Sequence, residues 1–359
     1  MSGPGESGVT GACGETGKDS DESAPLPIFL PCIMGPTGAG KTAASLALAE
    51  RLDISVVNAD SRQVYRDFPI ITAQPTREEQ ECCPHLLYGY LPTTEKLGAG
   101  AYARAATETI ATEVAGGRQP LLVGGTGLYF QALLSGIAPI PPVPAEISQK
   151  WQKLLLREGS PVLHTLLVEK DPLYAARIHP NDKQRVTRAL EVLEATGKPF
   201  SWWHGRSLPA SSYIACKAGI ALPLSELEAP LARRIECMLE AGALEEARKA
   251  LESCPDPAAP GWSGIGCAEV YRHLIGELNL DDCRALWLKN TRAYAKRQLT
   301  WFRADSEIRW FRPGETEELV AHVLRCRAKG SAPGTPLAKG SAPGTPLAKG
   351  SALGTRWGK

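Results

Sequence analysis

The stretch "IMGPTGAGKTAASLALAERL", residues 33–52, decides the fold of this chain. An apolar segment leads through a glycine-rich turn into a segment rich in alanine and leucine, which is typical of a strand, a tight loop and a helix. Residues 35–42, GPTGAGKT, fit the phosphate-loop pattern, in which backbone N–H groups and one lysine surround bound phosphates. A glycine turn that only joins a strand to a helix is the alternative, but the complete pattern in this context favours phosphate binding.

Three more apolar runs are predicted to be strands. They are DISVVNAD at 53–60, QPLLVGGTG at 119–127 and CKAGIAL at 216–222, and helices alone are predicted from there to about residue 328. Strands that alternate with helices form parallel sheets. The sequence therefore predicts an α/β fold, a phosphate-loop NTPase-like parallel sheet flanked by helices.

The segment 139–204 opens with a proline-rich hinge and then shows only helical periodicity, which predicts an all-helical insertion. The core is then formed by residues 26–138 and 205–328. Residues 1–25 are poor in large apolar side chains, and we expect a disordered leader there. The tandem repeat LAKGSAPGTP predicts a low-complexity tail at 329–359.

Composition excludes several protein classes. The 359 residues contain 40 Lys plus Arg and 39 Asp plus Glu, so attraction to a polyanion must come from local clustering. The 10 cysteines form no CxxC pair and no cysteine–histidine spacing of a zinc finger, which indicates reduced thiols. Neither a signal peptide nor an apolar run of about 20 residues is present, so we expect a cytoplasmic protein without a membrane span, and a monomer.

The phosphate loop supplies the first group of candidate site residues. Its backbone N–H groups, the N-terminus of the following helix and the Lys41 ammonium converge on one place, where two bridged phosphates fit. The Thr42 hydroxyl would bind Mg²⁺, which we expect as the cofactor. The candidate phosphate-binding residues are Gly35, Thr37, Gly38, Gly40, Lys41 and Thr42.

Polar residues follow the next two predicted strands. Asp60 ends one of them, and because the carboxyl ends of parallel strands face the ligand crevice, it could be a magnesium ligand, a general base or a helix N-cap. Thr126 follows the glycine pair that ends the third strand and offers a hydroxyl to a ligand. Gln63, shortly after Asp60, could read a base by paired hydrogen bonds or be an ordinary surface residue.

Positive charge gathers locally in two segments. Residues 284–312 contain eight Arg or Lys residues against two acids. On a helix, Trp287, Tyr294 and Trp301 would form one side, predicted to be core, opposite a basic stripe of Lys289, Arg292, Lys296 and Arg303. That stripe is either a solvated face or a surface for a phosphate backbone.

The second basic segment is HPNDKQRVTRALEV, at 179–192. Asn181 or Asp182 would cap a helix on which Arg185 and Arg188 are neighbours. An ordinary capped surface helix is the alternative to a nucleic-acid contact.

Five segments together resemble the tRNA dimethylallyltransferase family: GPTGAGKT, ADSRQVY, PLLVGGTGLYF, ARIHPNDKQRVTRALEV and TRAYAKRQLTWFR. The resemblance covers residues 28 to about 312. Members of this family transfer a dimethylallyl group from dimethylallyl diphosphate to the exocyclic amine of the adenine on the 3′ side of the anticodon. The resemblance therefore implies that the phosphate loop holds an allylic diphosphate rather than ATP, and that the anticodon stem-loop of tRNA is the partner.

The resemblance also implies roles for individual residues. Asp60 would take the proton of the adenine amine, and Lys41 would stabilise the departing diphosphate. Thr37 and Thr126 would contact the diphosphate or the base, and Arg234 in LARRIECMLEAG would reach the diphosphate, although Pro230 stands where the family has another arginine. On the tRNA side we place Ser61, Gln63, His179, Asp182, Arg185, Arg188 and the four residues of the basic stripe.

Other functions share the phosphate loop. A prenyltransferase for free adenine nucleotides would need neither the helical insertion nor the basic stripe. An ATP-dependent small-molecule kinase would need an acceptor site and lid motifs that the sequence does not show, and an RNA-binding ATPase would turn over ATP.

Overall fold

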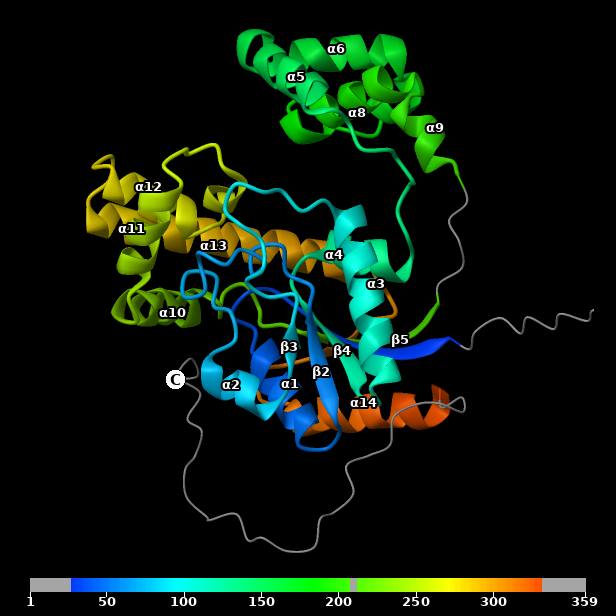
Figure 1. The fold of residues 1–359 in the computed structure, drawn as a ribbon, viewed down its shortest axis with the longest axis vertical. Coiled ribbons are helices and arrows are strands. Elements are labelled where there is room, and N and C mark those ends of the chain that lie inside the picture. Colours follow the sequence, from blue (N-terminus) through cyan, green and yellow to red (C-terminus); the bar gives the residue numbers. More distant parts are fainter. Residues whose placement is uncertain (1–26, 207–211, 331–359) are drawn as a thin grey trace, which may run out of the picture.

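The computed structural model describes residues 27–206 and 212–330, and its centre is one sheet of six parallel strands (Figure 1). The strand order is β3-β2-β4-β1-β5-β6. Their bounds are β1 Ile28–Met34, β2 Ile54–Asn58, β3 His85–Leu86, β4 Gln119–Gly124, β5 Tyr213–Ile220 and β6 Arg309–Phe311. The predicted parallel α/β sheet is confirmed.

Helices cover both faces of this sheet. The helices are α1 (Lys41–Ala49) and α14 (Thr316–Gly330) on one face, and α3 (Ala99–Ala115) and α4 (Gly127–Leu134) on the other. Alternate residues of β1 enter the two cores: Ile33 packs on the α1 and α14 side, and Cys32 on the α3 and α4 side. Burial on both faces explains why the strands read as continuous apolar runs.

A third core, besides those on the two faces of the sheet, lies beside the carboxyl ends of the strands. It unites α10 (Glu228–Glu240), α11 (Ala243–Ser253), the 3-10 turn Pro260–Ser263, α12 (Cys267–Leu274) and the long α13 (Leu280–Arg303). Residues from the loop after β2, Val64 and Phe68 among them, pack into it. A short helix, α2 (Arg77–Cys82), leads from this loop into β3. The loop after β2 is thus fixed against α10–α13, which positions the residues that follow Asp60.

The insertion forms a helical unit of its own, drawn above the sheet in Figure 1. Its helices are α5 (Ala145–Glu158), α6 (Ser160–Lys170), α7 (Pro172–Ala175), α8 (Lys183–Thr196) and α9 (Phe200–His204). Trp151, Leu167 and Val186 centre its separate core. The prediction of an all-helical insertion agrees with these elements.

The prediction of helices alone after about residue 222 is wrong. β6 interrupts them and pairs in parallel with β5, with Ala218 opposite Arg309. β3 was not predicted either, and β5 begins at Tyr213 rather than at 216. Strands of two or three residues carry too little alternation to show a period of two, because they are defined by pairing with a neighbour that is distant in sequence.

The two chain ends lie mostly outside the described residues. The leader predicted at 1–25 lies outside the described residues, and of the tail predicted at 329–359 only the first two residues are described, as the end of α14. Within 27–206 and 212–330, no helix is both long and apolar enough to cross a membrane. Every cysteine in these ranges is a free thiol.

Candidate active site

The phosphate loop turns tightly between β1 and α1. Gly35 has φ 155°, and a Cβ there would lie 2.3 Å from the carbonyl oxygen of Ile220 on β5. Gly38 has φ 78°, and a Cβ there would lie 2.9 Å from Leu231 Cδ2. The two glycines therefore allow the loop to lie directly against β5 and α10, and only a residue without a side chain fits at Gly35.

Lys41 folds back over this loop. Its Nζ donates hydrogen bonds to the carbonyl oxygens of Gly35 (3.0 Å) and Pro36 (2.9 Å). Removal from water lowers the pKa of Lys41 to about 8, while the nearby Asp60 carboxylate raises it and the Arg234 guanidinium lowers it again. The ammonium is therefore held over the loop, in a place where an anion would restore its charge.

Gln298, on α13, joins the loop to the end of β4. Its Oε1 accepts a hydrogen bond from the backbone N–H of Thr37 (3.0 Å), and its Nε2 donates to the carbonyl oxygen of Gly125 (2.9 Å). The side chain is buried, and a Cβ on Gly125 would lie 2.1 Å from Nε2. Gln298 was not predicted as a site residue. It follows Tyr294 by four positions and so lies on the aromatic face of the helix, and a polar residue on such a face could have indicated a buried hydrogen-bonding role.

Asp60 is held in place by its neighbours after β2. Buried Asn58 accepts a hydrogen bond from the Asp60 N–H (2.8 Å) and donates to the Asp60 carbonyl oxygen (3.1 Å). Asp60 Oδ1 accepts from the N–H of Arg62 (2.9 Å), which closes a turn. No described helix begins here, since α2 starts at Arg77, so the helix N-cap alternative is excluded for Asp60.

Thr126 connects the ends of β4 and β2. Its Oγ1 accepts a hydrogen bond from the N–H of Ser61 (2.9 Å) and donates to Ser61 Oγ (3.2 Å). Burial and the charge of Asp60 raise the pKa of Tyr294 to about 12, against the opposing effects of Arg62 and of a hydrogen bond with Thr126. Thr126 and Ser61 thus lie next to Asp60, with a phenol that stays neutral at physiological pH.

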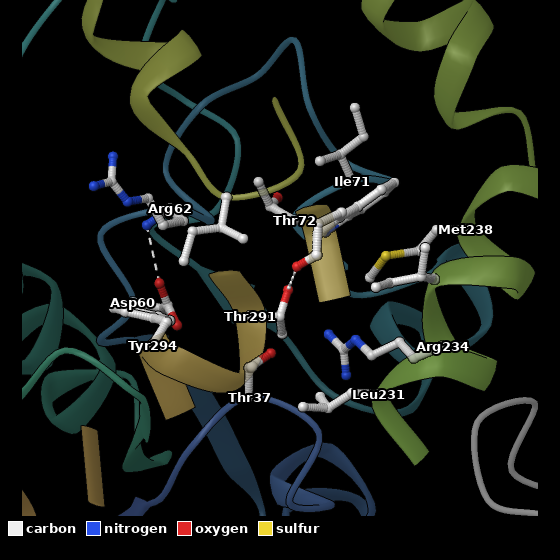
Figure 2. Close-up of a pocket in the computed structure, with 13 residues that line it drawn as sticks. Thr37, Asp60, Arg62, Ile71, Thr72, Leu231, Arg234, Met238, Thr291 and Tyr294 are labelled. Atoms are coloured by element: carbon white, nitrogen blue, oxygen red, sulfur yellow. Dashed lines mark hydrogen bonds between the residues drawn. The ribbon is translucent and has the colours of Figure 1, made fainter. Parts of the chain in front are cut away.

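Part of this set lines one pocket (Figure 2): Thr37, Asp60, Arg62 and Tyr294 do, whereas Lys41, Gln298, Ser61 and Thr126 are not among its lining residues. Asp60 with Tyr294 forms one side and Arg234 the other, with Thr37 between them. Leu231 and Met238 flank Arg234 on its side of the pocket, and Trp287 adds further apolar surface to the lining. The complete lining is Thr37, Asp60, Arg62, Ile71, Thr72, Leu231, Arg234, Ile235, Met238, Ile265, Trp287, Thr291 and Tyr294.

Arg234 extends from α10 into this pocket. The alternative that it lies on a solvent-exposed face of the helix is therefore excluded. Burial lowers the pKa of Arg234, while Asp60 and Glu79 raise it, and the guanidinium remains charged. Pro230 occupies the first turn of the same helix, where a missing N–H leaves no helical hydrogen bond broken. The helix therefore starts normally despite the proline.

The aromatic stripe of α13 is only partly core, which corrects the prediction. Trp287 is buried, but both Trp287 and Tyr294 line the pocket. Trp301 is 42% exposed and lies over Gly127, where a Cβ would be 2.0 Å from its Cδ1. A stripe that faces a cavity has the same periodicity as one that faces a core, so the sequence could not separate the two.

The basic stripe of α13 is exposed along its length. Lys289, Arg292, Lys296 and Arg303 are all exposed. Arg292, however, forms an ion pair with Glu228 of α10. The sequence did not predict this ion pair, because the acidic partner of Arg292 belongs to a neighbouring helix rather than to a position four residues away on α13.

The candidate tRNA-contacting residues of the insertion lie together at the start of α8. Asp182 is the helix N-cap and accepts the N–H of Arg185 (3.0 Å). His179 Nδ1 accepts the N–H of Asn181 (3.1 Å), and Arg188 pairs with Glu191 at 3.4 Å. The capped helix is confirmed, and a nucleic-acid contact stays a prediction.

Gln63 braces the loop after β2. Its Nε2 donates to the carbonyl oxygens of Thr72 (3.1 Å) and Ala73 (2.5 Å). Both protons of the Gln63 amide are therefore engaged. The Nε2 group could donate a hydrogen bond to a base only after it has left these two carbonyl oxygens.

The donor set for Mg²⁺ is compatible with the residues present. Thr42 lies exposed in the first turn of α1, and the Asp60 carboxylate lies close enough to the neighbouring Lys41 to raise its pKa. Hydroxyl and carboxylate oxygens together with phosphate oxygens and water form the environment that Mg²⁺ prefers.

Comparisons with known proteins agree with this geometry. The family described as "IPP transferase" matches residues 63–305, and "Isopentenyl transferase" matches residues 28–89. The chain is 59% identical over 292 residues to the tRNA dimethylallyltransferase of Nitratidesulfovibrio vulgaris (strain DP4), which spans 81% of this chain and 94% of that protein. The enzyme of Maridesulfovibrio salexigens is 57% identical over 292 residues, with 81% and 95% covered.

Solved structures of tRNA-modifying transferases are also similar to this chain. The full-length tRNA isopentenylpyrophosphate transferase of Bacillus halodurans is 32% identical, with a TM-score of 0.62, over 84% of this chain and 97% of that one. A eukaryotic dimethylallyltransferase, seen acting on tRNA, is 28% identical, with a TM-score of 0.69, over 84% and 77%.

Proposed function

The chain belongs to the tRNA dimethylallyltransferase family, and from this membership and its pocket we propose that it transfers a dimethylallyl group from dimethylallyl diphosphate to the exocyclic amine of the adenosine 3′-adjacent to the anticodon of tRNA. One observation carries the proposal. The pocket combines Thr37 of the phosphate loop and Arg234 with apolar side chains and a carboxylate. That combination suits a short isoprenoid diphosphate and an amine that must lose a proton.

The diphosphate end of the substrate would lie at the phosphate loop. In the reaction the bond between the allylic carbon and the diphosphate oxygen breaks, and negative charge grows on the leaving group. Lys41 and Arg234, with N–H groups of the loop, would stabilise this charge, which their position near Asp60 supports. The apolar side chains of Leu231, Ile235 and Met238 would hold the dimethylallyl chain.

The adenine would enter beside Asp60. As the bond from the amine nitrogen to the allylic carbon forms, the Asp60 carboxylate takes the amine proton. The N–H of Arg62 holds the carboxylate in position, and Asn58 holds the backbone of Asp60. A base in an anticodon loop must leave its stack to reach this depth. Tyr294 and Thr126 lie next to Asp60, where they could contact that base.

We propose Mg²⁺ as the cofactor, held by Thr42 and the diphosphate. When bound, it would offset negative charge on the leaving diphosphate. We further expect a monomer that acts in the cytoplasm, where its tRNA substrate is found.

The tRNA would bind across the insertion and α13. His179, Asp182, Arg185 and Arg188 lie at one end of α8, and the basic stripe runs along α13. A prenyltransferase for free adenine nucleotides would need neither surface. For that reason the nucleotide-specific function is the weaker alternative.

One experiment separates the candidate functions. The purified full chain is given dimethylallyl diphosphate labelled in its dimethylallyl group, with Mg²⁺ and either tRNA or AMP. We expect label on tRNA and none on AMP. Label on AMP alone would support the nucleotide enzyme, and tRNA-independent ATP turnover without label transfer would support an ATPase or kinase.

A further inference from the structure

A cluster of soft donor atoms lies between β5 and α14, on the α1 and α14 side of the sheet. The cluster consists of Cys216 on β5 and of His322 and Cys326 on α14, and its three donor atoms lie within 4.8 Å of one another. His322 and Cys326 are four residues apart on one helix, so they share a face. Cys216 points to the same side of β5 as the core residues Ala218 and Ile220, which turns its thiol toward α14.

The distances fit metal coordination. His322 Nε2 lies 3.7 Å from Cys216 Sγ and 3.7 Å from Cys326 Sγ. A tetrahedral zinc ion with Zn–S of about 2.3 Å and Zn–N of about 2.0–2.1 Å places a sulfur and a nitrogen ligand about 3.6 Å apart. The three donors therefore already have the spacing of three corners of such a site.

We propose that Cys216, His322 and Cys326 bind a thiophilic metal ion of the Zn²⁺ class. Two thiolates and one imidazole form a donor set that zinc prefers over harder ions. His322 and Cys326 are only half-buried, so water can occupy the fourth position. The ion would fasten α14 to β5, which pack against each other in the same apolar core.

The surroundings favour this role for the imidazole. Burial and the positive charges of Arg309 and Arg325 lower the pKa of His322. Burial raises the pKa of Cys216, and both cysteines are free thiols. Binding of one metal ion must therefore release two protons, one from each thiol, as the two sulfur–metal bonds form.

The site is independent of the proposed transferase activity. None of its residues lines the pocket that contains Asp60 and Arg234. Metal binding is expected to stabilise the folded chain, because the unfolded chain does not hold the three donors together. Transfer of a dimethylallyl group to tRNA should continue with the metal removed from this cluster.

The test uses the full chain, reduced and freed of metal, with Co²⁺ as a spectroscopic probe and Zn²⁺ as competitor. We expect one equivalent of Co²⁺ to give a thiolate-to-metal charge-transfer band that Zn²⁺ abolishes, and Zn²⁺ to raise the unfolding temperature. Removing a side chain that only supports a metal ligand typically weakens metal binding by about 10–100-fold. Removing a ligand itself should therefore weaken Co²⁺ and Zn²⁺ binding by more than that. Cys326→Ser and His322→Gln should each show that loss.

Cys82→Ser is the matched control, because Cys82 is an exposed thiol on α2, away from the cluster. This variant should keep the band and the thermal shift. Cys326 is half-buried, so its replacement tests the site even if Cys216→Ser unfolds the core. A reduced protein without the band, or a band of undiminished affinity in Cys326→Ser, would overturn the proposal.

Discussion

The side chain of Gln298 accepts a hydrogen bond from the N–H of Thr37 at 3.0 Å, and so connects the long helix α13 directly to the phosphate loop. The same amide donates to Gly125 at the end of β4. One buried residue therefore fixes two loops of the pocket relative to the helix that carries the basic stripe. This arrangement makes Gln298 a positioning residue for the diphosphate, although it does not line the pocket.

Replacing this residue should loosen the loop. In Gln298→Ala, the Thr37 N–H and the Gly125 carbonyl lose their partner, and a buried unpaired group costs about 1–3 kcal/mol. We expect the KM for dimethylallyl diphosphate to rise and kcat/KM to fall by about 10–100-fold, as steady-state assays with tRNA would measure. Gln80→Ala is the control, since Gln80 is exposed and bonds only to the Pro75 carbonyl. Equal kinetics for both variants would contradict the positioning role.

Asp60→Asn should remove the base and preserve the turn. The asparagine oxygen can still accept the Arg62 N–H, so the local fold is kept, while the proton of the adenine amine has no acceptor. We expect single-turnover transfer to slow by about 10²–10⁴ with unchanged tRNA affinity.

The matched control for that variant is Asp256→Asn. Asp256 Oδ1 accepts the N–H of Ala258 at 2.9 Å, the same local turn, but it does not line the pocket. Its turnover should stay at the wild-type level. If Asp60→Asn also kept wild-type turnover, another residue would have to act as the base.

Diphosphate binding should weaken as pH rises through about 8. The pKa of Lys41 in the ligand-free protein is about 8, and a bound diphosphate raises it, so binding takes up protons between the two values. Below pH 8 the ammonium is already present and affinity is greatest. Tyr294, with a pKa of about 12, does not titrate in this range.

Calorimetric titration of dimethylallyl diphosphate without tRNA, in two buffers of different ionisation enthalpy at pH 8.5, measures this uptake. The terminal phosphate of the substrate is fully ionised there, because the last proton of a phosphate ester leaves at a pKa of about 6. Lys41→Arg keeps its charge throughout and should bind with little pH dependence. Proton uptake of the same size in Lys41→Arg would assign the titration to another group.

The basic stripe should contribute to tRNA binding unequally. Lys289 and Lys296 are exposed, whereas Arg292 is already paired with Glu228. Changing both lysines to Gln should lower the slope of log affinity against log salt by about 0.7–0.9 per lost phosphate contact, and Arg292→Gln should lower it less. Diphosphate binding should not change.

The control for the stripe removes two charges elsewhere. Arg325 and Lys329 are exposed on α14, far from the insertion (Figure 1), and their double change to Gln should leave the salt slope intact. If the lysine variant also keeps its slope, tRNA binding must depend on the start of α8 instead. The electrostatic contribution of that surface could then be measured with Arg185→Gln.

Much of the site followed from local sequence. The phosphate loop, Lys41, Thr42 and Asp60 are recognisable because each lies within a few residues of a strand end, and parallel strands gather their ends at one edge of the sheet. The capped start of α8 at Asp182 followed for the same reason, since a cap bonds only to its own first turn. Hydrophobic patterning predicted four of the six strands, β1, β2, β4 and β5, and the helical insertion.

Tertiary structure alone decided the remainder. The amide of Gln298 lies 261 residues from its Thr37 partner, Gln63 is engaged by the backbone of its own loop, and Arg292 finds its acid on another helix. A pattern in sequence reports which face of a helix a residue occupies, but not whether a core, a cavity or a neighbouring helix lies opposite. These contacts depend on how distant elements pack, and so do the short strands β3 and β6 and the cluster of Cys216, His322 and Cys326.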